Sequence, residues 1–206
     1  MNRRNFIAGS SLRHGAEASN MNISELKTER LLLRQWVDQD LSAFAELNSD
    51  PETMKFFPAV LSLEESNAMA EKCKSLISER GWGFWAVELK SSGEFIGLVG
   101  LHIPKPNFPF SPCVEIGWRL LKEHWGKGYA IEAAQESLVY AFNTLNLNEV
   151  VSFTTVSNRR SRSVMQRLGF SNTHQNFEHP DIEKDHLLSE HVLYKITKQE
   201  WQEKDV

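Results

Sequence analysis

A short glycine-containing segment in the middle of the chain has the residue types of an anion-binding turn. Trp125-Gly126-Lys127-Gly128-Tyr129-Ala130 follows a strand-like run at 114–120 and leads into apolar residues at helical spacing. Glycine lets the backbone approach a ligand closely, and the first N–H groups of a helix have no partner within it. With the positive end of the helix dipole, they can hold a phosphate or pyrophosphate. A tight strand-to-helix turn without a ligand explains the same residues equally well.

Two common phosphate-binding motifs do not match this segment. A P-loop requires Gly-x-x-x-x-Gly-Lys-Ser/Thr, but Leu120 and Leu121 stand where its first glycine would fall, and Tyr129 replaces the hydroxyl residue. The dinucleotide fingerprint requires a third glycine where the chain has Ile131. The sequence therefore predicts neither a triphosphate P-loop nor a Rossmann-type dinucleotide site.

The segments around the turn alternate between strand and helix patterns. Ser62-Leu63-Glu64-Glu65 has the signature of a helix start, and Asn158 is a candidate N-cap for a helix that stops at Gly169. A shorter helix is expected to begin at Asp50-Pro51-Glu52. Strand patterns cover the residues 31–36, 84–89, 95–101, 114–120, 150–156 and 187–196. This order predicts one α/β domain with a mixed sheet.

Composition limits the classes of function. The chain has 206 residues and a formal net charge of −4, which argues against a nucleic-acid binder with a broad basic surface. No apolar run is long enough to cross a bilayer, so no membrane partner is expected. Cys73 and Cys113 cannot form a disulfide framework, and the histidines lack metal-ligand spacing, so we expect no metal site and a cytoplasmic location.

The first residues need a separate interpretation. Arg3-Arg4 resembles the start of a twin-arginine export signal, but the apolar stretch that should follow is cut short by Arg13-His14 and Glu17. We therefore expect residues 1–24 to be a disordered or artefactual extension, with Met21 as a candidate start. The folded domain is expected to cover residues 25–204.

Two segments together resemble the GNAT superfamily of N-acetyltransferases. The segment from Glu115-Ile116-Gly117-Trp118 through Trp125-Gly126-Lys127-Gly128-Tyr129-Ala130 is similar to its acetyl-CoA site, and Asn158-Arg159-Arg160-Ser161 up to Gly169-Phe170 to its Asn-x-x-Ala/Ser…Gly-Phe helix. Thr28-Glu29-Arg30-Leu31 and Leu193-Tyr194-Lys195 resemble the branch of ribosomal-protein N-terminal acetyltransferases. The resemblance implies a mostly antiparallel, centrally splayed sheet flanked by helices.

The resemblance also implies site residues. The pantetheine arm of acetyl-CoA would pair with the backbone of Trp118 and Leu120, and Asn158 would bond its amide. Glu115 is the candidate general base, with a structural ion pair as the alternative. Ser161 would protonate the departing thiolate or hold the cosubstrate, with a purely structural first-turn serine as the alternative. The cosubstrate site, and above all the amides that would hold the pyrophosphate, comprises Trp125, Gly126, Lys127, Gly128, Tyr129 and Ala130.

Two residues depart from the pattern. Trp125 stands where the superfamily usually has Gln or Arg, which removes one polar phosphate contact. Met165 stands where many relatives carry a tyrosine acid, and its thioether cannot donate a proton. The implied activity is acetyl transfer to a primary amine, either a protein N-terminus or a small amine, by a monomer or a homodimer. The alternative is an acyl-CoA-binding or sensing module without catalysis, which Met165 favours.

Overall fold

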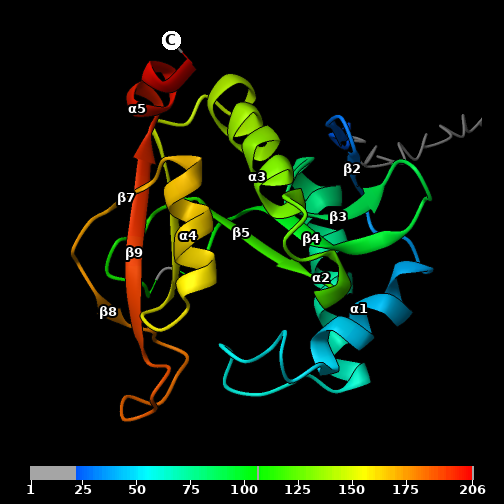
Figure 1. Cartoon of the computed structure of the whole chain (residues 1–206), viewed down its shortest axis with the longest axis horizontal. Helices are drawn as coiled ribbons and strands as arrows, with labels where there is room; N and C mark the ends of the chain where they lie inside the picture. The colour runs from blue at the N-terminus through cyan, green and yellow to red at the C-terminus, as the bar shows by residue number, and fades with distance from the viewer. Residues whose placement is uncertain (1–21, 106, 206) are drawn as a thin grey trace, which may run out of the picture.

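The computed structural model describes residues 22–105 and 107–205. One sheet contains every strand of this part of the chain, in the order β1-β2-β3-β4-β5-β6-β9-β7, and β8 also pairs with β9 (Figure 1). The strands are β1 (Leu26–Lys27), β2 (Leu31–Arg34), β3 (Phe84–Leu89), β4 (Phe95–His102), β5 (Glu115–Leu120), β6 (Glu149–Thr155), β7 (Ser171–Asn172), β8 (Phe177–Glu178) and β9 (Glu190–Thr197).

Helices cover both faces of the sheet. The α-helices are α1 (Asp40–Ser49), α2 (Leu63–Arg80), α3 (Tyr129–Val139), α4 (Arg159–Leu168) and α5 (Lys198–Gln202). Shorter turns form a 3-10 segment at Lys122–His124, a π-helical end of α3 at Tyr140–Thr144 and a 3-10 segment at Glu203–Asp205. Helices α1 and α2 pack together, and α3 packs on β4, β5 and α4 (Figure 1).

Pairing in the sheet is antiparallel except between β5 and β6. Strand β5 pairs with β4 over its whole length, from Glu115 opposite His102 to Leu120 opposite Gly97. The parallel pair has a single registered position, Glu115 opposite Val151. The predicted α/β fold with a mixed, mostly antiparallel sheet is confirmed.

Local sequence signals explain where the longest helix begins and ends. The Ser62 side chain accepts a hydrogen bond from the Glu65 N–H, and the Glu65 carboxylate accepts one from the Ser62 N–H, which together form a capping box. Gly81, with φ of 85°, ends the helix in the left-handed conformation that glycine adopts without strain. The prediction of a short helix beginning at Asp50 is wrong, because residues 51–56 form turns instead. The Asp50 carboxylate accepts hydrogen bonds from Thr53 there.

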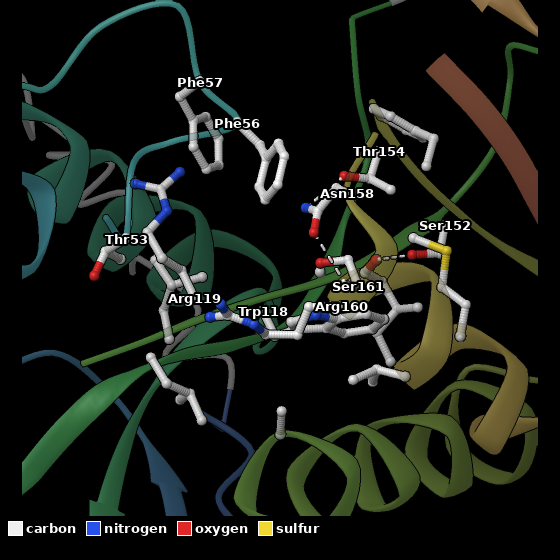
Figure 2. A pocket seen from close by; sticks show the side chains of 18 of the residues that line it. Thr53, Phe56, Phe57, Trp118, Arg119, Ser152, Thr154, Asn158, Arg160 and Ser161 are labelled. Carbon is white, nitrogen blue, oxygen red and sulfur yellow. Dashed lines mark hydrogen bonds between the residues drawn. The ribbon is translucent and has the colours of Figure 1, made fainter. Parts of the chain in front are cut away.

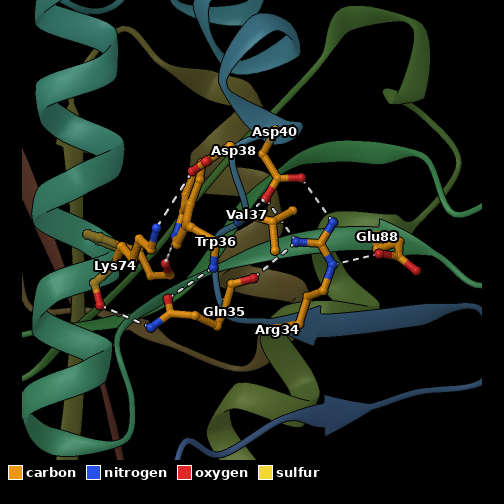
Figure 3. A network of polar contacts seen from close by, with 9 residues as sticks. Arg34, Gln35, Trp36, Val37, Asp38, Asp40, Lys74 and Glu88 are labelled. Atoms are coloured by element: carbon orange, nitrogen blue, oxygen red, sulfur yellow. Dashed lines mark hydrogen bonds and ion pairs between the residues drawn. The ribbon is translucent and has the colours of Figure 1, made fainter.

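A buried ion network joins β2, β3 and α1 (Figure 3). The Arg34 guanidinium donates to both carboxylate oxygens of Asp40 at 2.8 and 2.9 Å, and its Nε donates to Glu88 at 2.6 Å. These carboxylates hold the pKa of Arg34 above its ordinary value. Because a buried charge is costly unless it is paired and hydrogen-bonded, the network fixes the start of α1 on the sheet edge.

Within residues 22–105 and 107–205, no helix has the length and apolar character needed to span a membrane. The predicted extension at 1–24 lies almost wholly outside the described residues, which begin at 22.

Candidate active site

A cleft of about 840 Å³ opens where β5 and β6 separate. Residues from β5, the glycine turn, α3, β6 and α4 form one part of its wall, and Figure 2 shows their side chains around the opening. The 52–58 segment between α1 and α2 forms the other part, through Phe56 and Phe57. The predicted site residues that line the cleft are Glu115, Trp118, Leu120, Trp125, Gly126, Gly128, Tyr129, Ala130, Asn158 and Ser161.

The separation leaves one edge of β5 without a strand partner. The Val151 N–H donates to the Val114 carbonyl at 3.0 Å, and the Ser152 hydroxyl donates to the Ile116 carbonyl at 3.0 Å. Backbone groups alternate in direction along a strand, so the N–H and C=O of Trp118 face the same opening as those of Ile116. Beyond Ile116, no described residue of β6 pairs with this edge. An extended chain with amide groups can therefore bind to β5 here as an added strand.

Helix α3 begins directly after the glycine turn, and its first residues lie at the same cleft. Gly126 and Gly128 adopt φ values of 73° and 82°, a left-handed conformation that L side chains rarely adopt. A Cβ at Gly126 would meet nothing within 4 Å, so the turn presents open space rather than packed side chains. Within the part of the chain that the structure describes, no side chain caps α3. Its first amides and the positive end of its dipole therefore face the cleft without a described partner, as an anion site requires.

Arg30 supports this turn from outside the cleft. Its Nη1 donates to the Lys127 carbonyl at 3.0 Å, its guanidinium lies 4.4 Å from the centre of the Tyr129 ring, and its Nε bonds Glu132 at 2.6 Å. The Thr28 hydroxyl also donates to Glu132, at 2.6 Å. Thr28 and Arg30 belong to the motif Thr28-Glu29-Arg30-Leu31 near the N-terminus. The contacts of these two residues show that the motif holds the glycine turn in place. Lys127 itself does not line the cleft.

A cation lies beside the turn. The Arg160 guanidinium stacks on the Trp125 ring, 3.7 Å from its centre, and the Trp125 indole N–H donates to the Leu120 carbonyl at 2.9 Å. Because Trp125 is held by the backbone of β5, it provides a fixed platform for the arginine of α4. The positive charge absent at position 125 is thus supplied from the neighbouring helix.

The start of α4 places two further predicted residues in the cleft. The Asn158 carbonyl oxygen accepts from the Ser161 N–H at 3.2 Å, and its amide nitrogen donates to the Thr154 hydroxyl at 2.9 Å (Figure 2). Asn158 is therefore a helix N-cap, as its structural interpretation requires. The Ser161 hydroxyl makes no hydrogen bond with a described residue. Met165 is buried and lines the same cleft.

Glu115 lies at the point where β5 and β6 part. No ion pair or side-chain hydrogen bond to Glu115 occurs in the described part of the chain, so the structural ion pair considered as its alternative role is not formed there. Burial raises the pKa of the Glu115 carboxyl to about 8. A carboxyl group with such a pKa can exchange protons near neutral pH, as a general base must.

The other half of the cleft contains a residue that the sequence did not single out. Arg119 follows Trp118 on β5 and stacks on Phe57, with 4.2 Å between its guanidinium carbon and the ring centre. No motif distinguishes an arginine in a half-buried strand, and its neighbours come from distant segments, so sequence reasoning had no signal for it. Among the described residues, no group of three or more His, Cys, Asp or Glu side chains is arranged to hold a metal ion.

The sheet opens between two parallel strands beside an uncapped helix start, an arrangement suited to an extended ligand that carries a phosphate. A family model described as an acetyltransferase (GNAT) domain matches residues 30–171, and this chain belongs to that family. It is an N-acetyltransferase by family.

Individual proteins agree with this assignment. The FsC-acetyl coenzyme A-N(2)-transacetylase of Aspergillus fumigatus is 32% identical over 183 residues, covering 85% of this chain and 77% of that protein. An acetyltransferase (GNAT family) structure from Bacillus anthracis has a TM-score of 0.71 and 26% identity, covering 85% of this chain and 99% of the other. The ribosomal-protein-S5-alanine acetyltransferase from Vibrio fischeri shares the fold, with a TM-score of 0.65, 19% identity and coverage of 86% and 98%.

Proposed function

We propose that this protein binds acetyl-CoA in the cleft between β5 and β6 and transfers the acetyl group directly to a primary amine. The observation that carries the proposal is the free edge of β5 at Trp118 next to the uncapped start of α3. A pantetheine arm has amide groups that suit a strand edge, and a pyrophosphate suits helix amides. Acetyl-CoA contains both groups in sequence, so one ligand accounts for two adjacent features.

The residues of the cleft fit such a ligand. The Trp118 C=O and the Leu120 N–H can pair with the arm, while Gly126, Gly128, Tyr129 and Ala130 offer amides and space to the pyrophosphate. Arg160 adds positive charge beside them. Asn158 can contact the arm through the free electron pairs of its carbonyl oxygen while it caps α4.

Glu115 acts as the general base in this proposal. An alkyl amine is mostly protonated at neutral pH and cannot attack a carbonyl until it loses a proton. Glu115 takes that proton, directly or through water, and the amine then forms the new C–N bond. The carbonyl oxygen becomes negative as the amine attacks, and the free N–H of Trp118 stabilises that charge. The nitrogen loses its second proton as the thiolate leaves with a proton from Ser161 or from water, and that second proton replaces the one the donor gave up.

The acceptor class in this proposal is a primary amine, either a protein N-terminus or a small amine. The name of the Vibrio fischeri structure, which specifies alanine of a ribosomal protein, supports the first, and the N(2)-transacetylase of Aspergillus fumigatus supports the second. A non-catalytic acyl-CoA-binding module is the second candidate. Met165 favours it, because a thioether occupies the position from which a tyrosine could protonate the thiolate.

Thermal unfolding with and without acetyl-CoA, followed by a free-thiol assay over a panel of amines, tests the proposal. A ligand at about 100 times its dissociation constant adds roughly 2.7 kcal/mol of stability, which shifts the Tm visibly. Stabilisation with thiol release establishes the enzyme. Stabilisation by acetyl-CoA without release of free thiol in the presence of peptides, polyamines or amino acids supports the binding module. Absence of any Tm shift contradicts both.

A further inference from the structure

The acceptor half of the cleft contains an arginine that lacks a carboxylate partner among the described residues. Arg119 Nη1 donates to the Asn48 carbonyl oxygen at 2.6 Å and lies 3.9 Å from the Met69 sulfur. No ion pair forms between Arg119 and an acidic residue in the described part of the chain. Its Nε is buried and has no hydrogen-bond partner there.

The position of this guanidinium is fixed by its surroundings. Asn48 is fully buried, and its amide nitrogen donates to the Ser66 hydroxyl at 2.9 Å, which turns its carbonyl oxygen toward Arg119. The Phe57 ring holds the plane of the guanidinium from one side. Figure 2 shows Arg119 beside Phe57 and Thr53, across the opening from Asn158 and Ser161.

The unused donors of Arg119 lie on one edge of the guanidinium. Nη1 is occupied by Asn48, whereas neither Nε nor Nη2 has a hydrogen-bond partner among the described residues. Because Nε is buried, a ligand can reach this edge only at Nη2, through a charge-assisted hydrogen bond. Nη2 is thus the donor that remains for an anion.

Arg34 in the same molecule is an arginine whose charge is balanced by protein carboxylates. It is bonded by two carboxylates, Asp40 and Glu88 (Figure 3). Arg119 is shielded among Phe57, Met69 and Asn48 and is bonded by no carboxylate of the described residues. Burial lowers the pKa of its guanidinium to about 10. A shielded charge without a counter-ion is costly, so its place in a cleft wall indicates that a ligand provides the anion.

Arg119 and the candidate base also share one face of β5. Residues 115, 117 and 119 point to the same face of a strand, and position 117 is a glycine. Both side chains line the cleft. Phe84, which also lines the cleft, packs over Gly117, so an acceptor whose amine approaches Glu115 would pass along the Phe84 ring to place a second group at Arg119.

We infer that Arg119 forms an anion subsite for the acceptor, and that the acceptor is a primary amine carrying a carboxylate. This inference rests on the proposed acetyl transfer. The carboxylate can belong to a free amino acid or to an acidic side chain of a peptide, since both present the same group. Polyamines are disfavoured, because their additional positive charges would face the Arg119 guanidinium.

The test compares acceptors with and without the carboxylate, at a pH above the pKa of each amine, because amidation of a free amino acid also lowers the pKa of its amine. Free amino acids are compared with their carboxamides, peptides with an N-terminal Glu with those with Gln, and spermidine is included, with thiol release as the readout. We expect the carboxylate forms to have kcat/KM values about 10- to 100-fold higher, the usual worth of a hydrogen-bonded charge pair. Whichever pair shows the difference identifies whether the carboxylate comes from an amino acid or a peptide.

Variants locate the effect at Arg119. Arg119→Gln should remove the preference for the carboxylate forms while leaving the dissociation constant for acetyl-CoA unchanged, and Arg119→Lys, which keeps charge without the planar edge, should retain part of it. Lys72→Gln is the matched control, since it removes an exposed cation of α2 that does not line the cleft. It should keep the full preference.

The outcomes separate the two proposals. If acetyl-CoA neither stabilises the protein nor releases thiol, the proposed acetyl transfer fails and the inference fails with it. If thiol is released but amides or spermidine are the better acceptors, only the inference is overturned. If acetyl-CoA binds without turnover, carboxylate amines should still bind the CoA-bound protein more tightly than their amides, and equal binding overturns the inference.

Discussion

The Arg160 guanidinium lies 3.7 Å above the centre of the Trp125 ring, so a residue of α4 and a residue of the glycine turn form one unit at the mouth of the cleft. Trp125 is anchored by its hydrogen bond to the Leu120 carbonyl. The aromatic residue at position 125 therefore does not leave the phosphate end of the site without charge. It positions a cation that the helix start of α4 brings from 35 residues further along the chain.

Replacing Arg160 with Gln should weaken acetyl-CoA binding about tenfold, because a charge-assisted contact with a phosphate is worth about 1.5 kcal/mol or more. The dissociation constant from a binding titration measures this, and it should become less sensitive to salt. Lys72→Gln, which removes an exposed cation outside the cleft, should bind as the unmodified protein does. Unchanged affinity in Arg160→Gln would remove Arg160 from the cosubstrate site.

Gly126→Ala should reduce acetyl-CoA affinity at least about tenfold while costing only about 1 kcal/mol of stability. Gly93 offers a matched control. It has the same φ of 73°, and a Cβ there would also meet nothing within 4 Å, but it lies in the hairpin between β3 and β4. Gly93→Ala should cost similar stability in denaturant unfolding and leave affinity unchanged. Equal affinities in the two variants would show that the turn at 126 does not contact the cosubstrate.

The pKa of Glu115, raised to about 8 by burial, should appear in the pH dependence of the reaction. As the base must be deprotonated, kcat/KM should rise with pH up to about 8 and then level off. In Glu115→Gln only free amine reacts, so kcat/KM should continue to rise toward the pKa of the amine. The deficit of the variant should be largest below about pH 8 and shrink above it.

A pH–rate profile measured on both proteins tests this expectation. Glu64→Gln, on the exposed first turn of α2, is the control and should keep the break near pH 8. A break that persists in Glu115→Gln would assign it to another group and remove Glu115 from the role of base.

The same carboxyl group should affect stability. Its pKa in the folded protein lies above the ordinary value of 4.5, so the native state binds more protons than the unfolded state between these values. The folded protein is stabilised by holding Glu115 in its neutral form. This contribution to the free energy of unfolding is fully present below about pH 4.5 and is lost as pH rises through about 8. Glu115→Gln should lack this decline and gain on the order of 4 kcal/mol relative to the unmodified protein between about pH 5 and pH 9. Denaturant unfolding at several pH values measures it, and parallel stability curves would contradict it.

Much of the fold was predictable because its signals are local. The capping box at Ser62, the cap at Asn158 and the glycine stops at Gly81 and Gly169 each act within a few residues, and the structure has helix boundaries at all four. The 51–56 segment was mispredicted for a local reason too. The Asp50 carboxylate accepts hydrogen bonds from the N–H and the hydroxyl of Thr53, which stabilises a turn in place of a helix start.

The alternation of strands and helices, the family and the glycine turn at 126–128 were predictable from the residues alone, since periodicity, caps and backbone conformation depend on neighbouring residues. The surroundings of each functional group follow from the folded arrangement of the whole chain. The cation on the Trp125 ring, the support of the turn by Arg30, and the lack of an ion-pair partner for Arg119 and Glu115 among the described residues all depend on how distant segments meet. Burial and the lack of a partner are properties of a folded neighbourhood, which no local pattern of residues encodes.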